Sequence, residues 1–210
     1  MNEKAAQSTQ HPARLAVLLS GRGSNFSAIQ QAIAGGTLNA EIVCVISNRP
    51  GAPGVVRARE LGLTVHEIDH KAHQSRLDHE YAVLQVLKDA RPDFVILAGY
   101  MRLLSSSFIE EWRNRIINIH PSLLPAFPGV NAQKQAVDYG VKISGCTVHF
   151  VDENLDAGPI IVQRVVEVRD DTAETLGARI LEQEHVAYVE ALVALGTRAW
   201  RIDGRRVVFE

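Results

Sequence analysis

The chain has 210 residues, of which 46% are hydrophobic, and its formal net charge at pH 7 is -2. This length and apolar content are enough for one substantial hydrophobic core, and nothing in the composition requires a second domain. The lysines and arginines are scattered along the chain rather than gathered in a stripe, which makes nucleic acid a poor candidate partner.

The N-terminal segment is polar and carries no apolar signal core, and no run in the chain has the length of a membrane span. We therefore expect a flexible tail over residues 1–13, a single domain over residues 14–210, and a cytoplasmic protein without membrane contact. Cys44 and Cys146 each lie in an apolar run, with no second thiol at metal-ligand spacing. They are predicted to be buried free thiols in a reducing compartment.

Apolar runs and helical patterns alternate along the first 120 residues. Predicted strands cover residues 14–20, 40–48, 63–69, 92–100 and 116–120, and predicted helices cover residues 25–36, 51–62, 75–91 and 105–115. Alternation of this kind is typical of right-handed βαβ units. The expected fold class is therefore α/β, with a doubly wound, mostly parallel sheet and helices on both faces.

The last third of the chain has a different pattern. Residues 143–153 and 158–168 are predicted to form two extended strands of a hairpin-like unit, followed by a helix over residues 173–195. Residues 200–209 place Asp-Gly between two alternating apolar runs, which is a strong signal for a second hairpin.

A glycine-containing loop, SGRGSN, leads from the first predicted strand into the first predicted helix. The main-chain N–H groups of Gly23, Ser24 and Asn25 would point outward with the helix dipole behind them, which suits an anion. Phe26 stands where the dinucleotide fingerprint has its third glycine, so a phosphate monoester fits better than a dinucleotide. A tight strand-to-helix turn without a ligand explains this segment equally well by itself.

The segment NIHPSLLPAFPG, residues 118–129, contains three prolines and follows a predicted strand, so it forms a stiff loop at a carboxyl strand end. Asn118 and His120 lie two residues apart on that strand and point the same way. Asp156, in ENLDAGPI, can supply a carboxylate that favours the protonated imidazole, and both His120 and Asn118 can then donate to an oxyanion. Structural hydrogen bonding is the simpler explanation of such a pair alone, but its placement favours catalysis.

No serine or cysteine nucleophile accompanies this group. Ser20, Ser24 and Ser122 lack a G-x-S-x-G setting, which favours direct transfer between two bound substrates over an acyl-enzyme.

The remaining histidines give weaker signals. His66, His70, His73 and His79 crowd one stretch without a metal-ligand pattern, so we expect a solvated surface and no metal. His149 lies in an apolar strand and is either a hydrogen-bonded core residue or a support for the site, with the second reading favoured. Glu184 and His185, late in a helix, could lie at the surface or reach the site.

Six segments of this chain taken together closely resemble the phosphoribosylglycinamide formyltransferases, folate-dependent enzymes of purine biosynthesis. These segments are SGRGSN, SNRPGAPGVVRA, DFVILAGYMRLL, NIHPSLLPAFPG, GCTVHFVDENLDAGPII and EQEH, and the likeness runs from about Arg14 to the final hairpin. NIHPSLLP and LDAGPI alone would mark only the wider superfamily that handles folate-bound formyl groups. The resemblance implies a Rossmann-like fold and transfer of a formyl group from 10-formyltetrahydrofolate to the amine of glycinamide ribonucleotide, without a metal.

The resemblance also assigns roles to residues. It implies that Asn118, His120 and Asp156 are catalytic, that Gly23, Ser24 and Asn25 bind the substrate phosphate, and that Glu184 binds the ribose hydroxyls. It places folate along Met101, Arg102, Leu103 and Leu104 and along the loop of Val151, Asp152, Glu153, Asn154, Leu155 and Asp156, with Arg76 at the glutamate tail. The N-terminal half would thus bind phosphate, and the C-terminal half would bind folate and carry catalysis. Asn131 stands where better-known members carry a histidine.

Three alternatives remain at this point. Formyltetrahydrofolate hydrolase shares the three catalytic residues but carries a regulatory domain before them, and only a short polar tail precedes the first predicted strand here. Methionyl-tRNA formyltransferase would need a further C-terminal domain and a basic surface for RNA. A non-catalytic nucleotide-binding module would leave the three residues unexplained. A homodimer is one assembly that the sequence allows.

Overall fold

The computed structural model describes residues 11–210, and these divide into two compact units. The N-terminal unit ends at Ile117, and the C-terminal unit runs from Asn118 to Glu210. The predicted tail, residues 1–13, lies almost entirely outside the described residues, and the first strand begins at Ala13. The assignment of residues 14–210 to one domain stays a prediction. Within residues 11–210, no helix combines the length and the apolar character needed to cross a membrane.

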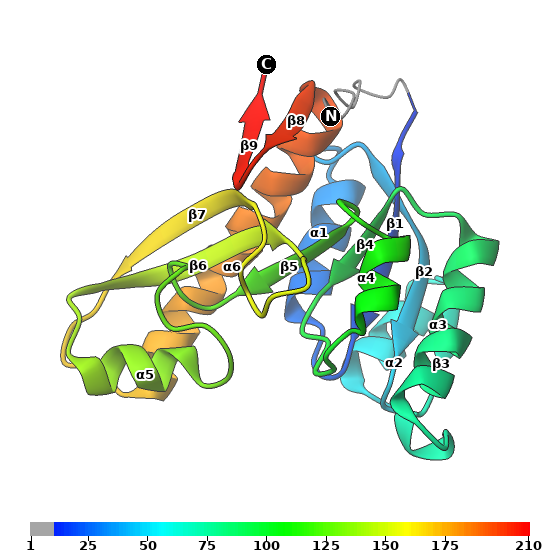
Figure 1. Cartoon of the computed structure of the whole chain (residues 1–210), viewed down its shortest axis with the longest axis horizontal. Coiled ribbons are helices and arrows are strands. Elements are labelled where there is room, and N and C mark those ends of the chain that lie inside the picture. The colour runs from blue at the N-terminus through cyan, green and yellow to red at the C-terminus, as the bar shows by residue number, and fades with distance from the viewer. Residues whose placement is uncertain (1–10) are drawn as a thin grey trace. The chain divides into compact units, whose positions relative to one another are not determined.

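The N-terminal unit alternates strands and helices, as predicted. Its elements are β1 (Ala13–Leu19), α1 (Ser24–Ala34), β2 (Ala40–Ser47), α2 (Pro53–Glu60), β3 (Val65–Glu67), the short 3-10 helix η1 (His70–Ala72), α3 (Arg76–Ala90), β4 (Phe94–Leu97) and α4 (Ser106–Glu111). The strand order is β3-β2-β1-β4, and β1 pairs parallel with β2 and β4, as β2 does with β3. Figure 1 shows α1 and α3 on opposite sides of these strands. The predicted doubly wound α/β arrangement is confirmed here.

Local sequence explains these elements. Side chains on both faces of β1 are buried, which is why the strand reads as a continuous apolar run rather than an alternating one. Two helices begin at serine caps: Ser75 Oγ accepts a hydrogen bond from Asp78 N (3.1 Å), and Ser105 Oγ accepts one from Phe108 N (3.3 Å). The predicted serine cap of the helix over residues 105–115 is therefore confirmed, although α4 ends earlier than expected.

The C-terminal unit contains the hairpins that the sequence predicts. Its elements are β5 (Ile116–His120), whose first two residues belong to the N-terminal unit, α5 (Ala132–Tyr139), β6 (Ile143–Phe150), β7 (Ile160–Glu167), α6 (Ala173–Thr197), β8 (Trp200–Asp203) and β9 (Arg206–Phe209). The strand order is β5-β6-β7-β9-β8, with antiparallel pairing of β6 with β7 and of β8 with β9. The long helix α6 runs along β6 and β7 in Figure 1 and packs on both.

Helix α5 was not predicted. It is only eight residues long, and the two residues that it buries, Ala132 and Ala136, are too small to produce a visible apolar periodicity. The helix starts at Asn131, whose backbone has a φ of 59°. Asparagine adopts this left-handed conformation more readily than most residues, which accounts for its presence at this position.

The histidine-rich stretch is not the solvated surface that we expected. His66, His70 and His73 are half-buried, and His79 is only 1% exposed because it lies on the inner face of α3 with Val83 and Leu87. Burial lowers the pKa of His79, and its Nε2 lies 3.0 Å from the carbonyl oxygen of Ile68. The surface prediction was therefore wrong for His79, since a histidine that takes an apolar position in a helix has no distinguishing local pattern.

The two cysteines are buried free thiols, as predicted. Burial raises the pKa of Cys44 to about 11 and that of Cys146 to about 12, so neither forms a thiolate near neutral pH. Residues 11–210 contain no group of three or more side chains that could hold a metal ion.

Candidate active site

The C-terminal unit brings His120 and Asp156 together at the carboxyl end of β5. His120 is 4% exposed, its Nδ1 lies 3.3 Å from Asp156 Oδ2, and its Nε2 lies 2.8 Å from the carbonyl oxygen of Phe127. Both ring nitrogens thus face acceptors. The ring donates to both acceptors at once only when each nitrogen carries a proton.

Asp156 lies in the loop between β6 and β7 with a φ of 50°. Its side chain is 10% exposed, and Oδ2 accepts a hydrogen bond from the main-chain N–H of Gly129 (2.8 Å) as well as facing His120. A left-handed backbone at a non-glycine residue is uncommon and persists where surrounding contacts enforce it. The carboxylate is therefore held in one position beside the imidazole.

The proline-rich loop after β5 supplies main-chain groups to both of these side chains. Phe127 provides the carbonyl oxygen that faces His120, and Gly129 provides the N–H that binds Asp156. Three prolines restrict the conformations of the loop, so these two groups stay in place with little loss of entropy on folding. This arrangement explains why a stiff segment follows the histidine.

Two side chains of the hairpin, Thr147 and Gln163, hold this loop by hydrogen bonds. The hydroxyl of Thr147, on β6, donates to the carbonyl oxygen of Ser122 (2.7 Å) and accepts from the N–H of Leu124 (3.0 Å). Gln163, on β7, donates through Nε2 to the carbonyl oxygen of Leu124 (2.9 Å) and to Thr147 Oγ1 (3.0 Å). The loop is thereby attached to the strands that flank Asp156.

Replacing Thr147 with valine tests whether this attachment matters for activity. Thr147→Val keeps the shape but leaves the N–H of Leu124 and the carbonyl of Ser122 without this partner, so we expect turnover to fall by about tenfold as the loop loosens. Thr147→Ser keeps the hydroxyl and is the matched control, with turnover near that of wild type. Steady-state kinetics on variants that unfold at a similar temperature measure the effect. Equal turnover of the valine and serine variants would contradict it.

Asn118 lies on the same strand as His120, and its amide faces His149 on β6. Asn118 Nδ2 lies 3.3 Å from His149 Nε2, and His149 Nδ1 lies 2.9 Å from the carbonyl oxygen of Phe150. Burial lowers the pKa of His149 although Asp156 is near, so the ring is neutral, donates through Nδ1 and accepts through Nε2. This leaves Asn118 oriented with its second amide N–H available to a ligand.

A register shift in the hairpin accompanies this arrangement. The pairing of β6 with β7 is irregular between Val148 and His149, at the position where the strand approaches Asn118. Such bulges bend a strand and redirect a side chain. We expected His149 to support the site rather than to be only a hydrogen-bonded core residue, and its contact with Asn118 is consistent with that expectation.

The glycine loop of the N-terminal unit has the form expected of an anion site. Helix α1 begins at Ser24, directly after Gly23 with a φ of 70°, and has no acidic residue in its first turn. The main-chain N–H groups of Gly23 and Ser24 make no hydrogen bonds within residues 11–210. Asn25 is the second residue of α1 and lies in the same turn. A Cβ on Gly23 would lie 3.0 Å from the Cα of Gly54, so the close packing of α2 against this loop requires glycine.

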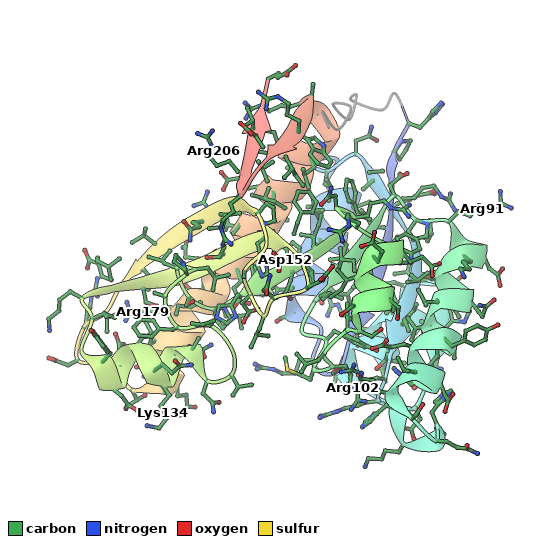
Figure 2. All side chains as sticks on the ribbon, viewed as in Figure 1. Arg91, Arg102, Lys134, Asp152, Arg179 and Arg206 are labelled. Carbon is green, nitrogen blue, oxygen red and sulfur yellow. The ribbon has the colours of Figure 1, made fainter. Side chains whose placement is uncertain are left out.

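The other predicted binding residues are distributed over both units. Met101 and Leu103 expose 69% and 65% of their surface after β4, and Arg76 is exposed at the start of α3. The predicted folate loop, residues 151–156, follows β6, and Asp152, labelled in Figure 2, accepts a hydrogen bond from the N–H of Asn154 (2.9 Å). Glu184 is 8% exposed on α6, and its charge acts on Cys146 of β6. Its neighbour His185 is half-buried.

Sequence reasoning missed four contributors to the site: the carbonyl of Phe127, the N–H of Gly129, Thr147 and Gln163. Main-chain groups leave no signature in a side-chain pattern, and a threonine or glutamine in a strand resembles any other strand residue. The three prolines of the loop were the only available signal.

Comparison with known proteins identifies the family of this chain. The formyl transferase family matches residues 13–192. The phosphoribosylglycinamide formyltransferase of Bacillus subtilis is 38% identical over 88% of this chain and 97% of that protein. A crystal structure of glycinamide ribonucleotide transformylase 1 from Symbiobacterium toebii has 44% identity and a TM-score of 0.91, covering 96% of this chain and 95% of its own.

Two further similar proteins are a much longer protein and a deformylase of lower identity. This chain spans only 14% of the length of the trifunctional purine biosynthetic protein adenosine-3 of Drosophila melanogaster, to which it is 47% identical over 89% of its own length. A formyltetrahydrofolate deformylase from Pseudomonas syringae is 28% identical, with a TM-score of 0.88 over 95% of this chain and 66% of that protein. The family match covers most of the chain and includes Asn118, His120 and Asp156, and the chain therefore belongs to the formyl transferase family.

Proposed function

We propose that this protein transfers the formyl group of 10-formyltetrahydrofolate to the amine of glycinamide ribonucleotide, giving formylglycinamide ribonucleotide and tetrahydrofolate. The observation that carries the proposal is the arrangement of two hydrogen-bond donors, Asn118 and His120, with the carboxylate of Asp156. The names of the relatives that match along nearly their whole length support the same substrate pair.

The chemistry follows from these groups. The neutral amine attacks the formyl carbon, and the carbonyl oxygen becomes an oxyanion as the tetrahedral intermediate forms. The free N–H of Asn118 and the imidazolium of His120 donate to that oxyanion, which stabilises the transition state more than the ground state. The intermediate then collapses with cleavage of the bond to N10 of folate, and the proton lost by the amine is balanced by the proton that N10 gains.

Ligand binding requires one change at His120, because both of its ring nitrogens already face acceptors. Nδ1 lies 3.3 Å from Asp156, a longer separation than the 2.8 Å between Nε2 and Phe127. The Nδ1–H bond is therefore the easier one to share with an oxyanion, while Asp156 continues to stabilise the positive charge of the ring.

The binding residues complete the proposal. The phosphate of the ribonucleotide binds the N–H groups of Gly23, Ser24 and Asn25, and Glu184 accepts from the ribose hydroxyls. Folate lies along residues 101–104 and 151–156, with Arg76 at its glutamate tail. The reducing compartment suggested by two buried free cysteines supports a cytoplasmic location. A homodimer stays a prediction.

The closest alternative is hydrolysis, in which water replaces the amine on the same catalytic groups. The higher identity to the transformylase structure, 44% against 28% for the deformylase, favours transfer to the ribonucleotide. A non-catalytic nucleotide-binding module would leave the contact between His120 and Asp156 without a purpose.

One experiment separates these functions. The protein is mixed with 10-formyltetrahydrofolate, and deformylation is followed optically with and without glycinamide ribonucleotide. We expect turnover that depends on the ribonucleotide, because a site that binds its phosphate is needed to place the amine. Comparable rates without it would establish the hydrolase, and ribonucleotide binding without any turnover would establish the non-catalytic module.

A further inference from the structure

The segment Met101–Leu104, which follows β4, combines exposure with unpaired main-chain groups. Leu103 is exposed. The main-chain N–H and C=O groups of Arg102, Leu103 and Leu104 make no hydrogen bonds to other residues in the range 11–210. Figure 2 shows Arg102 at the end of the N-terminal unit opposite to Arg91, which precedes β4. A segment of this kind is open to a ligand that presents its own donors and acceptors.

The start of this segment is fixed by buried side chains. Ser20 Oγ accepts a hydrogen bond from the N–H of Met101 (2.8 Å) and donates to Asn48 Oδ1 (2.5 Å). Ser20 is 3% exposed and Asn48 is 1% exposed. Ser20 follows β1, Asn48 follows β2 and Met101 comes after β4, so two hydrogen bonds join the carboxyl ends of three parallel strands.

The Asn48 amide is oriented by Ser20. Its Oδ1 accepts from the Ser20 hydroxyl, and His70 Nδ1 lies 2.8 Å from the main-chain carbonyl oxygen of Asn48, closer than the 3.2 Å that separates it from Nδ2. The main-chain N–H of Ser20 also donates to the carbonyl oxygen of Gly99 (3.1 Å). The Ser20 hydroxyl consequently has one donor partner and one acceptor partner, so its hydrogen-bonding capacity is used by these two contacts.

The far end of the segment is also fixed. Glu80, which is 5% exposed on α3, accepts hydrogen bonds from the N–H of Ser105 (3.0 Å) and from the Ser105 hydroxyl. Ser105 is the residue after Leu104 and caps α4. The three residues between these two anchors, Arg102 to Leu104, are therefore held in shape without using their own main-chain groups.

We propose that Ser20 and Asn48 are positioning residues that preorganise the main chain of residues 101–104 for the folate donor. This inference rests on the proposed function, which places folate along this segment. A flat heterocycle with donors and acceptors on its edge pairs with a main chain whose unpaired groups are already fixed, and the entropy of ordering the segment is not lost on binding. Ser20 and Asn48 act through Met101 rather than by touching the ligand.

Ser20→Ala is the direct test, because it removes the acceptor for the Met101 N–H with little change in volume. We expect the KM for 10-formyltetrahydrofolate to rise by about 3- to 10-fold, the effect of losing one such hydrogen bond. The KM for glycinamide ribonucleotide and kcat should stay within about twofold of wild type. Hydrogen exchange should also show faster exchange of the Met101 amide in the variant.

Ser144→Ala is the matched control. Ser144 is 2% exposed on β6, and its hydroxyl has no hydrogen-bond partner in the described part of the chain, so the same substitution removes no bond. Its folate KM should equal that of wild type. Ser20→Cys keeps a weak acceptor at this position and should give a folate KM between those of wild type and Ser20→Ala. It replaces Ser20→Ala as the test variant if the alanine variant does not fold.

The outcomes separate this inference from the proposed function. Wild-type protein that fails to transfer the formyl group would overturn the proposed function. An active wild type whose folded Ser20 variants keep the wild-type folate KM, or lose affinity for both substrates equally, would overturn the positioning role alone. Tetrahydrofolate binding by calorimetry gives the same comparison without turnover.

Discussion

Replacing Asp156 with asparagine should lower turnover by about a hundredfold or more, on the scale of losing one oxyanion donor. The side chain keeps its shape, and asparagine tolerates the left-handed backbone at this position, where φ is 50°. The amide oxygen can still accept from the N–H of Gly129, so the loop should stay in place. What disappears is the negative charge that lies 3.3 Å from the His120 ring and, in the proposed mechanism, stabilises the ring as it donates to the oxyanion.

The measurement is kcat and the two KM values for Asp156→Asn. Binding of both substrates should change much less than kcat, because the charge acts chiefly on the transition state. Asp138→Asn is the matched control: Asp138 is exposed on α5 and forms an ion pair with Lys134 Nζ (2.5 Å), so its kcat should stay within about twofold of wild type. Near-normal turnover of Asp156→Asn would show that the carboxylate serves only to order its loop.

Replacing Asn118 with aspartate should be at least as damaging, with a fall in kcat between about 100-fold and 1,000-fold. The substitution is nearly isosteric but exchanges an N–H donor for a negatively charged acceptor at the place where the oxyanion develops. It also removes the N–H that faces His149 Nε2 at 3.3 Å, so the carboxylate loses the contact that orients the amide. If Asn118 served only in packing, this nearly isosteric substitution would change kcat little.

Steady-state kinetics on folded Asn118→Asp test this expectation, and Asn39→Asp is the control for the same change at an exposed position of the N-terminal unit. The control should retain turnover within about twofold. If Asn118→Asp kept more than a tenth of the wild-type kcat, Asn118 would not be an oxyanion donor.

The strands and the longer helices were predictable because their periodicity is local. Strand β1 appears as a continuous apolar run because both of its faces are buried, and the Asp-Gly turn between β8 and β9 identifies that hairpin. Helix α5 escaped prediction because its buried residues are alanines, and His79 was misplaced because its burial depends on what α3 packs against.

The sequence alone determined that Asn118 and His120 point the same way, because side chains two residues apart on a strand share a face. It also placed them before a loop whose prolines leave few conformations. Tertiary structure decided the rest: that Asp156, 36 positions along the chain from His120, faces its ring, that His149 orients Asn118, and that Phe127 and Gly129 contribute main-chain groups. The physical reason is that periodicity fixes the direction of a side chain within one element, whereas a contact between elements depends on register and on loop geometry, which no local pattern encodes.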